Sequence, residues 1–370
     1  MERNLNLSLV CKPWHHIVVS DPRLWSNIII RFNTDLTNLR FLWRQVDISL
    51  SRSKQLPLDI EINLRDIPIY QKYIRGGHSD PLSFTEHNNI APTTIRRLLG
   101  QDREHVYRWR SFCLICLLSD NRVAAADVWK ALEGKYDALT RLHIALFQHS
   151  ATANISFPIL SSCATNQPVR PMEILINPSK LSWISFLSSE MTIAFLRMAA
   201  TTTFSALSTL RIGISSRGGI SDVPLHFPQL SKLTLFTSLS GVVIPPLLDA
   251  PDLTDMDILW RRDGNINFLP SHIFAKLKAL RFSLERSQRN EGGYQYIREP
   301  LRVALPLATS LEKLKIAAEP TLPEQLTDLV RELRGDGHPL ARLQEITLEN
   351  TTLLDGKTHQ TIVIIDVAAQ

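Results

Sequence analysis

The chain has 370 residues, with 41 lysines and arginines against 36 aspartates and glutamates, so its formal net charge is +5. Hydrophobic residues make up 44% of the chain and charged residues 21%, which is typical of a folded protein with a large core and excludes global disorder. The basic residues occur in short, scattered groups at 96–97, 103–110 and 261–262. Because nucleic-acid binding needs clustered lysine and arginine, we expect no nucleic-acid partner.

The number of cysteines and the hydropathy of the chain limit the cellular compartments in which we expect the protein. The four cysteines are too few for a disulfide scaffold of this size, which favours a reducing compartment, cytoplasmic or nuclear. The longest apolar run, about residues 112–118, is far below the ~18 residues that a membrane helix needs. The N-terminal residues lead into no signal-type apolar segment. We therefore expect neither export nor a membrane partner.

The first predicted element is a helix over about residues 7–18. Leu7, Val10 and Trp14, with residues 11, 17 and 18, follow the spacing of one apolar helix face. Pro13 lies inside this segment, so a kink or a break is expected there.

Two more helices should follow. Asp21 and Pro22 predict an N-cap followed by proline at the first helical position, which begins a short helix containing Leu24 and Trp25. A third helix is expected over about residues 35–51. Trp14 and Trp25 are interpreted as filling the core of this helical cap.

From residue 139 onward, a frame of the form apolar-x-x-apolar-x-apolar recurs. Its last two apolar positions are two residues apart, which is the period of a strand with one buried face. Weaker copies occur at Trp109/Phe112/Leu114 and Val169/Met172/Ile174. The seven strong copies are Leu139/Leu142/Ile144, Leu207/Leu210/Ile212, Leu230/Leu233/Leu235, Leu253/Met256/Ile258, Leu277/Leu280/Phe282, Leu311/Leu314/Ile316 and Leu343/Ile346/Leu348.

The spacing of the frames predicts a stacked parallel sheet. From Leu207 the steps are 23, 23, 24, 34 and 32 residues, which leaves room for the crossover that parallel strands require. Helices are expected in some crossovers, at 122–130, 191–199 and 323–334. Two polar stretches, 76–92 and 285–299, are predicted to be surface loops. One unit cannot bury its apolar face alone, so the units must stack.

Residues between the buried positions of each strand should form ladders on the concave face of this arc. One predicted row is His143, Arg211, Thr234, Asp257, Arg281, Lys315 and Thr347. The neighbouring row is Arg141, Thr209, Lys232, Asp255, Ala279, Lys313 and Glu345. This mixture suits a polar or partly acidic protein partner, and a solvated face without a ligand is the open alternative. The predicted partner-binding residues are His143, Arg211, Lys232, Asp257, Arg281 and Lys315.

Other motifs favour packing over chemistry. Cys113 and Cys116 lack a second cysteine pair, and His15–His16 lack a third ligand, so no metal site is expected. The Gly218–Gly219 and Gly292–Gly293 pairs lack the following lysine and hydroxyl residue of a phosphate loop. The sequence contains no nucleophile elbow. We therefore predict no catalytic residues, no cofactor and no enzymatic activity.

Residues 9–14, Leu-Val-Cys-Lys-Pro-Trp, and 20–25, Ser-Asp-Pro-Arg-Leu-Trp, together resemble the second half of an F-box. Residues 50–53, Leu-Ser-Arg-Ser, and 56–60, Leu-Pro-Leu-Asp-Ile, resemble the segment after the F-box in the large fungal F-box family. Residues 108–111, Arg-Trp-Arg-Ser, are similar to a further motif of that family. The repeats themselves resemble leucine-rich repeats without the usual asparagine ladder.

This resemblance implies the substrate receptor of a cullin-RING (SCF-type) ubiquitin ligase, with a protein substrate of unknown identity. The implied contacts with a Skp-type adaptor are Leu7, Val10, Trp14, Pro22, Leu24 and Trp25. Family members usually have a further helix before this point, and its absence from the sequence predicts weak or lost adaptor binding. A ligase-independent interaction scaffold with a degenerate F-box is the alternative.

The expected fold class is α/β. It is an irregular leucine-rich-repeat-like solenoid with a parallel sheet, capped by a small N-terminal helical F-box remnant. Residues 1–45 are assigned to the partial F-box and linking helix, and 46–370 to the solenoid.

Overall fold

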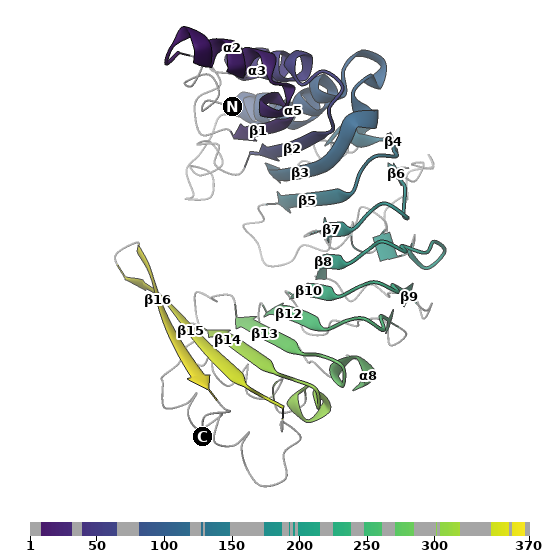
Figure 1. Ribbon diagram of the computed structural model, residues 1–370, viewed down its shortest axis with the longest axis vertical. Helices are drawn as coiled ribbons and strands as arrows, with labels where there is room; N and C mark the ends of the chain where they lie inside the picture. Colours follow the sequence, from purple (N-terminus) through teal and green to yellow (C-terminus); the bar gives the residue numbers. More distant parts are fainter. Residues whose placement is uncertain are drawn as a thin grey trace. The chain divides into compact units, whose positions relative to one another are not determined.

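The computed structural model forms two compact units, Met1–Ser185 and Phe186–Gln370, each described by itself below. Parallel strands dominate both units and helices are few, so the structure is of the α/β class (Figure 1). The residues that the structure describes are 9–31, 39–64, 81–118, 127–128, 130–148, 174–186, 192, 195–196, 199–214, 225–237, 248–260, 271–284, 301, 304–318, 342–354 and 357–366.

The first unit begins with helices and continues as strands. Its elements are α2 (Lys12–Ser20), η1 (Pro22–Trp25), β1 (Asn27–Arg31), α3 (Leu39–Arg52), β2 (Leu58–Asn63), α5 (Pro81–Leu99), η3 (Gln101–Arg103), η4 (Val106–Arg108), β3 (Trp109–Leu118), β4 (Gly134–Tyr136), β5 (Arg141–Gln148), β6 (Ile174–Ile176) and β7 (Trp183–Phe186), whose last residue crosses the boundary.

The sheet of the first unit is parallel. Strands β1, β2, β3 and β5 are hydrogen-bonded neighbours in that order, while β4 and β6 form a separate small sheet. Ile28, Ile60, Phe112 and Leu142 are aligned in register and all are buried, so they form one layer of the core. The strand β1 was not predicted, because the sequence analysis assigned no element to residues 27–31.

The N-terminal helices largely agree with the predicted ones. Helix α2 begins at Lys12 with Pro13 in its first turn, so the expected interruption at Pro13 is the start of the helix. The Asp21 side chain caps η1 by accepting a hydrogen bond of 3.0 Å from the Arg23 backbone N–H. Helix α3 then buries Val46 and Leu50, as expected for the third helix.

The predicted loop at 76–92 is wrong from residue 81 onward, because helix α5 begins there. Proline at the first position starts a helix without losing a bond, and the second proline, Pro92, lies inside it. The helix is anchored through its C-terminal half, where Ile90, Ile95 and Leu98 are buried. The many polar residues between 83 and 89 are the reason that this stretch resembles a loop in the sequence.

In the residues that the structure describes, the second unit consists mostly of strands. Its elements are β8 (Thr209–Ile214), β9 (Leu225–His226), β10 (Lys232–Thr237), β11 (Leu248–Asp249), β12 (Asp255–Trp260), α8 (Ser271–Phe274), β13 (Ala279–Leu284), η5 (Leu305–Leu307), β14 (Lys313–Ala318), β15 (Glu345–Leu354) and β16 (Lys357–Asp366).

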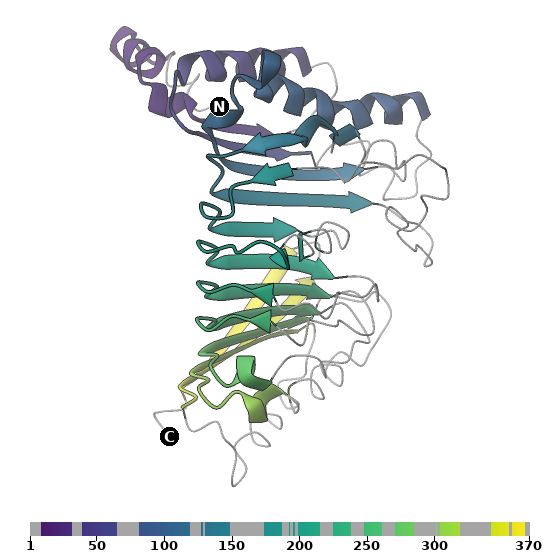
Figure 2. The same ribbon diagram turned by 90° about the vertical axis from the view of Figure 1, so that its right-hand side faces the viewer.

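Strands β8, β10, β12, β13, β14, β15 and β16 are neighbours in chain order, and they are parallel except for the antiparallel pair β15–β16. That final pair departs from the expected all-parallel arrangement. Strands β9 and β11 form a separate two-stranded sheet. Figure 2 shows successive strands of the second unit beginning at the same edge of the sheet.

A tight turn precedes the strands and repeats with them. At each turn the first apolar residue of the frame donates its N–H to the carbonyl oxygen three residues earlier, over 3.1–3.3 Å. In the second unit the donor–acceptor pairs are Leu207–Phe204, Leu230–Phe227, Leu253–Ala250, Leu277–Phe274 and Leu311–Ala308, and in the first unit the pair is Leu139–Tyr136. All twelve residues are buried, so each turn contributes two side chains to the core.

The strand prediction is confirmed for all seven strong frames, which contain β5, β8, β10, β12, β13, β14 and β15. The weak copy at Val169/Met172/Ile174 is placed differently. Ile174 begins β6 of the small sheet, and the other two residues lie outside the described residues. The frame that carries β7 is Leu181/Ile184/Phe186. The loop expected at 285–299 and the helix expected at 323–334 also lie outside the described residues.

Replacing Leu280 with alanine should lower the free energy of unfolding by about 2–5 kcal/mol, because a fully buried leucine leaves a cavity when truncated. Lys278→Ala, two residues earlier at an exposed position, is the matched control and should change stability by less than about 0.5 kcal/mol. Urea unfolding followed by circular dichroism measures both. Equal effects of the two substitutions would contradict the assignment of the buried face.

Candidate functional site

Trp25 ties the N-terminal helices together. Its ring is buried, and its indole N–H donates a hydrogen bond of 2.6 Å to the carbonyl oxygen of Val18 at the end of α2. The guanidinium of Arg52, at the end of α3, lies 4.5 Å from the centre of the Trp25 ring. A cation over an indole face is a favourable contact. The core role expected for Trp25 is therefore confirmed.

Arg108 joins the end of α3 to the strands. Its side chain is buried, its Nη2 donates to Ser53 Oγ over 2.6 Å, and its Nε donates to the Leu56 carbonyl oxygen over 3.0 Å. Ser53 in turn donates to the carbonyl oxygen of Leu50 over 2.9 Å. Burial lowers the pKa of Arg108, and these hydrogen bonds supply part of what the side chain loses on leaving water.

The residues next to Arg108 extend this junction. Arg110 forms an ion pair with Asp59 on β2. Trp109 is fully buried and stacks on Phe112 with ring centres 4.8 Å apart. Segments 20–25, 50–53, 56–60 and 108–111 are therefore connected by side-chain contacts, and we name them the junction. The sequence analysis treated each segment separately and predicted no role for Arg108. A single buried arginine belongs to no repeating pattern, so the sequence does not reveal its burial.

Apolar side chains next to the junction are exposed to solvent. Val10 is 65% exposed, Trp14 47% and Ile17 50%, and Leu9 in the preceding turn is 82% exposed. Residues 10, 14 and 17 follow the i, i+4, i+7 spacing of one helix face. We name Val10, Trp14 and Ile17 the α2 face. The core role expected for Trp14 is wrong, because nothing among the described residues covers its ring as α3 covers Trp25.

The other implied adaptor contacts are distributed between core and surface. Pro22 and Leu24 are half-buried on η1, and Trp25 lies in the core below them. Leu7 lies outside the described residues. The structure thus leaves Val10, in the turn before α2, and Trp14, on α2, both exposed, while Trp25 is held in the core by its hydrogen bond to Val18.

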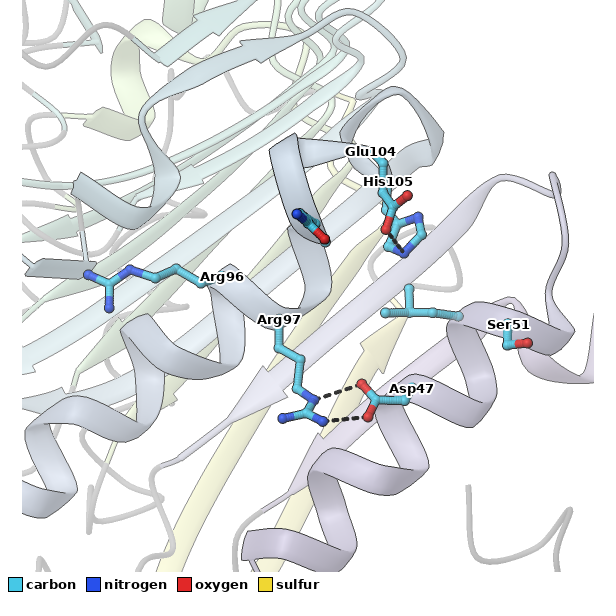
Figure 3. Close-up of a pocket in the computed structure, with 9 residues that line it drawn as sticks. Asp47, Ser51, Arg96, Arg97, Glu104 and His105 are labelled. Atoms are coloured by element: carbon cyan, nitrogen blue, oxygen red, sulfur yellow. Dashed lines mark hydrogen bonds and ion pairs between the residues drawn. The ribbon is translucent and has the colours of Figure 1, made fainter.

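An open depression lies between α3, α5 and the turn after α5 (Figure 3). Asp47 on α3 and Arg97 on α5 face each other across it and form a bidentate ion pair. Hydrogen bonding to Asp47 raises the pKa of Arg97. The indole N–H of Trp43 donates to Thr94 over 3.5 Å, a second and weaker link between the two helices. These contacts fix α3 on α5.

The turn beside the depression requires glycine at Gly100. Its φ of 79° is in the left-handed region, and a Cβ there would lie 2.7 Å from Glu104 Cγ. His105 follows, with its Nε2 3.6 Å from Glu104 Oε1. Burial lowers the pKa of His105, and this effect exceeds the opposing one of Glu104. The imidazole is therefore held toward its neutral form.

The predicted ladders occur in the second unit with the expected register. Arg211, Thr234, Asp257, Arg281, Lys315 and Thr347 lie side by side on successive strands, as do Thr209, Lys232, Asp255, Ala279, Lys313 and Glu345. We name these twelve residues the outward face. Thr234 is the buried member, and the others are half-buried or exposed. Whether this face binds a partner stays a prediction.

Contacts on the outward face are partly ionic. Lys232 Nζ lies 3.4 Å from Asp257 Oδ2, and Lys313 Nζ lies 3.5 Å from Glu345 Oε2. The Arg211 guanidinium lies over the Phe236 ring, 4.4 Å from its centre. Arg211 is half-buried, and burial lowers its pKa. The Phe236 ring and the charge of the Asp257 carboxylate therefore both act on Arg211.

His143 belongs to the first unit. It lies on β5 in register with Cys113 on β3, and its ring contacts Trp183 at a centre-to-centre distance of 5.7 Å. Burial raises the pKa of both Cys113 and Cys116 to about 12, so both thiols are protonated at neutral pH. Within the described residues, no group of three or more histidine, cysteine and acidic side chains is placed to hold a metal ion.

Comparison with known proteins gives no relative: no protein-family model and no curated protein matches the chain. No helix in the described part of the chain is both long and apolar enough to span a membrane.

Replacing Arg108 with methionine should lower the free energy of unfolding by about 2–3 kcal/mol, since hydrogen bonds of a charged group contribute about 1.5–3 kcal/mol. The control is Arg110→Met, which breaks the more exposed pair with Asp59 and should change stability by about 0.2–1 kcal/mol. Denaturant unfolding compares the two. A loss for Arg110→Met as large as that for Arg108→Met would remove Arg108 from the centre of the junction.

The lowered pKa of His105 predicts a pH dependence. Its folded-state pKa lies below the ordinary 6.5, so the unfolded chain binds more protons between the two values. The stability associated with neutral His105 is fully present above pH 6.5 and is lost as the pH falls toward the folded-state pKa. Relative to His105→Gln, the protein should therefore become less stable on acidification. A relative gain would show that the Glu104 pair outweighs burial.

Proposed function

We propose that this chain is the substrate-recognition subunit of an SCF-type cullin-RING ubiquitin ligase. In this proposal the N-terminal helices are part of an F-box that contacts a Skp-type adaptor. The strands form an irregular leucine-rich-repeat-like solenoid that binds a protein substrate. The activity of the chain itself is binding, and catalysis belongs to other subunits, so its place is the cytoplasm or the nucleus.

The observation that carries the proposal is the junction. The segments that resemble the F-box family are separate in the sequence, yet side-chain contacts connect 20–25 with 50–53, and 108–111 with both 50–53 and 56–60. Trp25 stacks with Arg52, and Arg108 hydrogen-bonds to Ser53 and Leu56. Motifs that occurred by chance would have no reason to meet. Their contact supports reading them as one inherited module that fixes the helices to the first strands.

The α2 face supports the docking step. Two apolar side chains of α2, Trp14 and Ile17, and Val10 in the turn before it are exposed next to the junction, and exposed apolar surface of this kind is typical of an interaction site. Full burial of a large apolar side chain contributes roughly 1.5–3 kcal/mol, so covering this face contributes several kcal/mol to a complex. A helix-in-groove contact uses the same i, i+4, i+7 anchors.

The repeated turn supports the solenoid. Each repeat of about 23–34 residues has the same turn, the same strand register and the same two buried positions in its strand. In a solenoid, each repeat is stabilised by contacts with the repeats next to it. These contacts use the buried face of each strand, so the exposed face stays available for binding a partner.

The test is a calorimetric titration against a Skp-type adaptor of two proteins, the purified chain and a form extended upstream by the front helix of an F-box. The chain as given should bind weakly or not at all, and the extended form should bind tightly. In the extended form, Trp14→Ala should weaken binding about tenfold or more, because one exposed anchor is lost without disturbing the core. His16→Ala, on the same helix but off the α2 face, should leave the affinity unchanged. If the extended form shows no adaptor binding while it still captures a protein partner, the ligase-independent scaffold replaces this proposal.

A further inference from the structure

The strand β16 is the last strand of the sheet in the second unit (Figure 1). It pairs with β15 over its full ten residues, from Asp366 opposite Glu345 to Lys357 opposite Leu354, without a register shift. Among the described residues, no strand pairs with its other edge. The backbone of an edge strand presents N–H and C=O groups along its outer side, and a further strand can bind to them.

The middle of β16 lacks the features that protect edge strands from pairing. Residues 361–365 are Thr-Ile-Val-Ile-Ile, five β-branched residues in a row without a proline or a charge, and such residues favour strands. Protected edges are short or carry charges, prolines or bulges. The strand β1, at the edge of the sheet in the first unit, is such an edge, since it has five residues and ends in Arg31. The long and regular edge of β16 is instead typical of a strand-pairing site.

Part of the β15–β16 hairpin has no third strand beside it. The strand β15 pairs with β14 through residues 345–350 and with β16 through residues 345–354. Residues 351–354 and 357–360 therefore form a two-stranded ribbon among the described residues, and Figure 1 shows it extending beyond β14. A two-stranded ribbon is only marginally stable in water. Pairing of β16 with a further strand would therefore stabilise it.

The charges at the two ends of β16 favour a second copy of the same strand in the opposite direction. Lys357 is the first residue of β16, and Asp366 is the last. Antiparallel pairing of two copies brings the Lys357 end of each strand next to the Asp366 end of the other. Parallel pairing in register would place like charges side by side, which is destabilising.

The two faces of a sheet limit the register of this pair. Successive residues alternate between the faces, and residues directly opposite each other share a face. An antiparallel pair of identical strands must therefore be centred on one residue. Centring on Ile362 pairs residues 358–366 of both copies and keeps β-branched residues together in the middle, with Ile362 opposite Ile362, Thr361 opposite Val363 and Thr358 opposite Asp366. Centring on Thr361 would instead place the polar Gln360 opposite Ile362.

We propose that two copies of this chain associate through β16, paired antiparallel about Ile362, so that the sheets of their second units become continuous. This inference does not rest on the proposed function, because the α2 face belongs to the first unit and is tested separately.

The first experiment is sedimentation velocity of the full chain over a range of concentrations, which should show a monomer that converts to a dimer as the concentration rises. Ile362→Lys should raise the dissociation constant of the dimer at least about tenfold, because two lysines then lie directly opposite each other. Thr358→Lys is the matched control. It adds the same charge on the same face, but opposite Asp366 of the other copy, and should leave the dimer intact.

A charge exchange separates lost pairing from lost folding. Ile362→Lys and Ile362→Glu should each be largely monomeric alone, and an equimolar mixture of the two should form a dimer, because opposite charges then meet at the centre. Circular dichroism checks that both variants fold. A chain that stays monomeric at every concentration, or a mixture that fails to pair, would overturn the proposal and leave the edge of β16 to a strand of another protein.

Disulfide formation tests the register. In a chain that carries Cys11→Ser and Cys163→Ser, the variant Ile362→Cys should form a disulfide-linked dimer on mild oxidation, because residues directly opposite each other have Cα atoms about 4.5–5.5 Å apart. In Thr361→Cys the two introduced cysteines are offset by two residues, about 8 Å apart, and should remain unlinked. Gel electrophoresis without reductant compares the two. Equal or stronger linkage through residue 361 would contradict pairing about Ile362.

Discussion

The second unit depends on one carbonyl oxygen per repeat that accepts two N–H groups. The Ser208 oxygen accepts from Ser231 and Lys232, and the Ser231 oxygen accepts from Thr254 and Asp255, all over 2.9–3.1 Å. Thr254 and Lys278 continue the series toward β13 and β14. In the first unit Thr140 accepts from Ser182 and Trp183 in the same way. Each new strand is thereby fixed in register at its first residues.

This register decides which side chains meet. A slip of one residue would exchange the buried and outward faces of a strand, so a fixed start fixes both the core and the ladders. The tight turn before it has a matching role, because it turns Phe204 and Phe227 inward, where Phe195 lies 5.1 Å and 6.2 Å from their ring centres. Backbone hydrogen bonds thus set the geometry, and aromatic and aliphatic side chains supply the burial that stabilises it.

Periodicity explains which parts of the fold the sequence predicts. The strands from β8 to β15 follow a pattern with two buried positions per strand, and their ladders follow directly from it. The strand β1 also fits that pattern, through Trp25, Ile28 and Ile30, but the sequence prediction assigned no element to residues 27–31, between the short helix at Asp21 and the helix expected from about residue 35. The sequence analysis did not predict the frame Leu181/Ile184/Phe186, because the spacing between frames is irregular in this part of the chain. It named a weaker frame upstream at Val169/Met172/Ile174.

Features that are not periodic were harder to predict. Arg108 is one buried arginine whose partners, Ser53 and Leu56, are more than 50 residues away, and only the folded chain brings them together. The exposure of Trp14 was equally hard to predict, because it too depends on how the folded chain packs. An apolar helix face predicts that something covers it, but the sequence does not say whether the cover is part of the chain or a partner.

The two candidate surfaces place opposite demands on the fold. The α2 face is apolar and exposed, so in the proposed adaptor complex its contribution comes from removing apolar surface from water. The outward face is polar and lies on strands whose other face is buried, so in the proposed substrate complex its contribution comes from charges already in position. An apolar surface favours lasting association, and a charged surface favours discrimination among partners. This division of properties suits the proposed receptor, which stays on its ligase while it exchanges substrates.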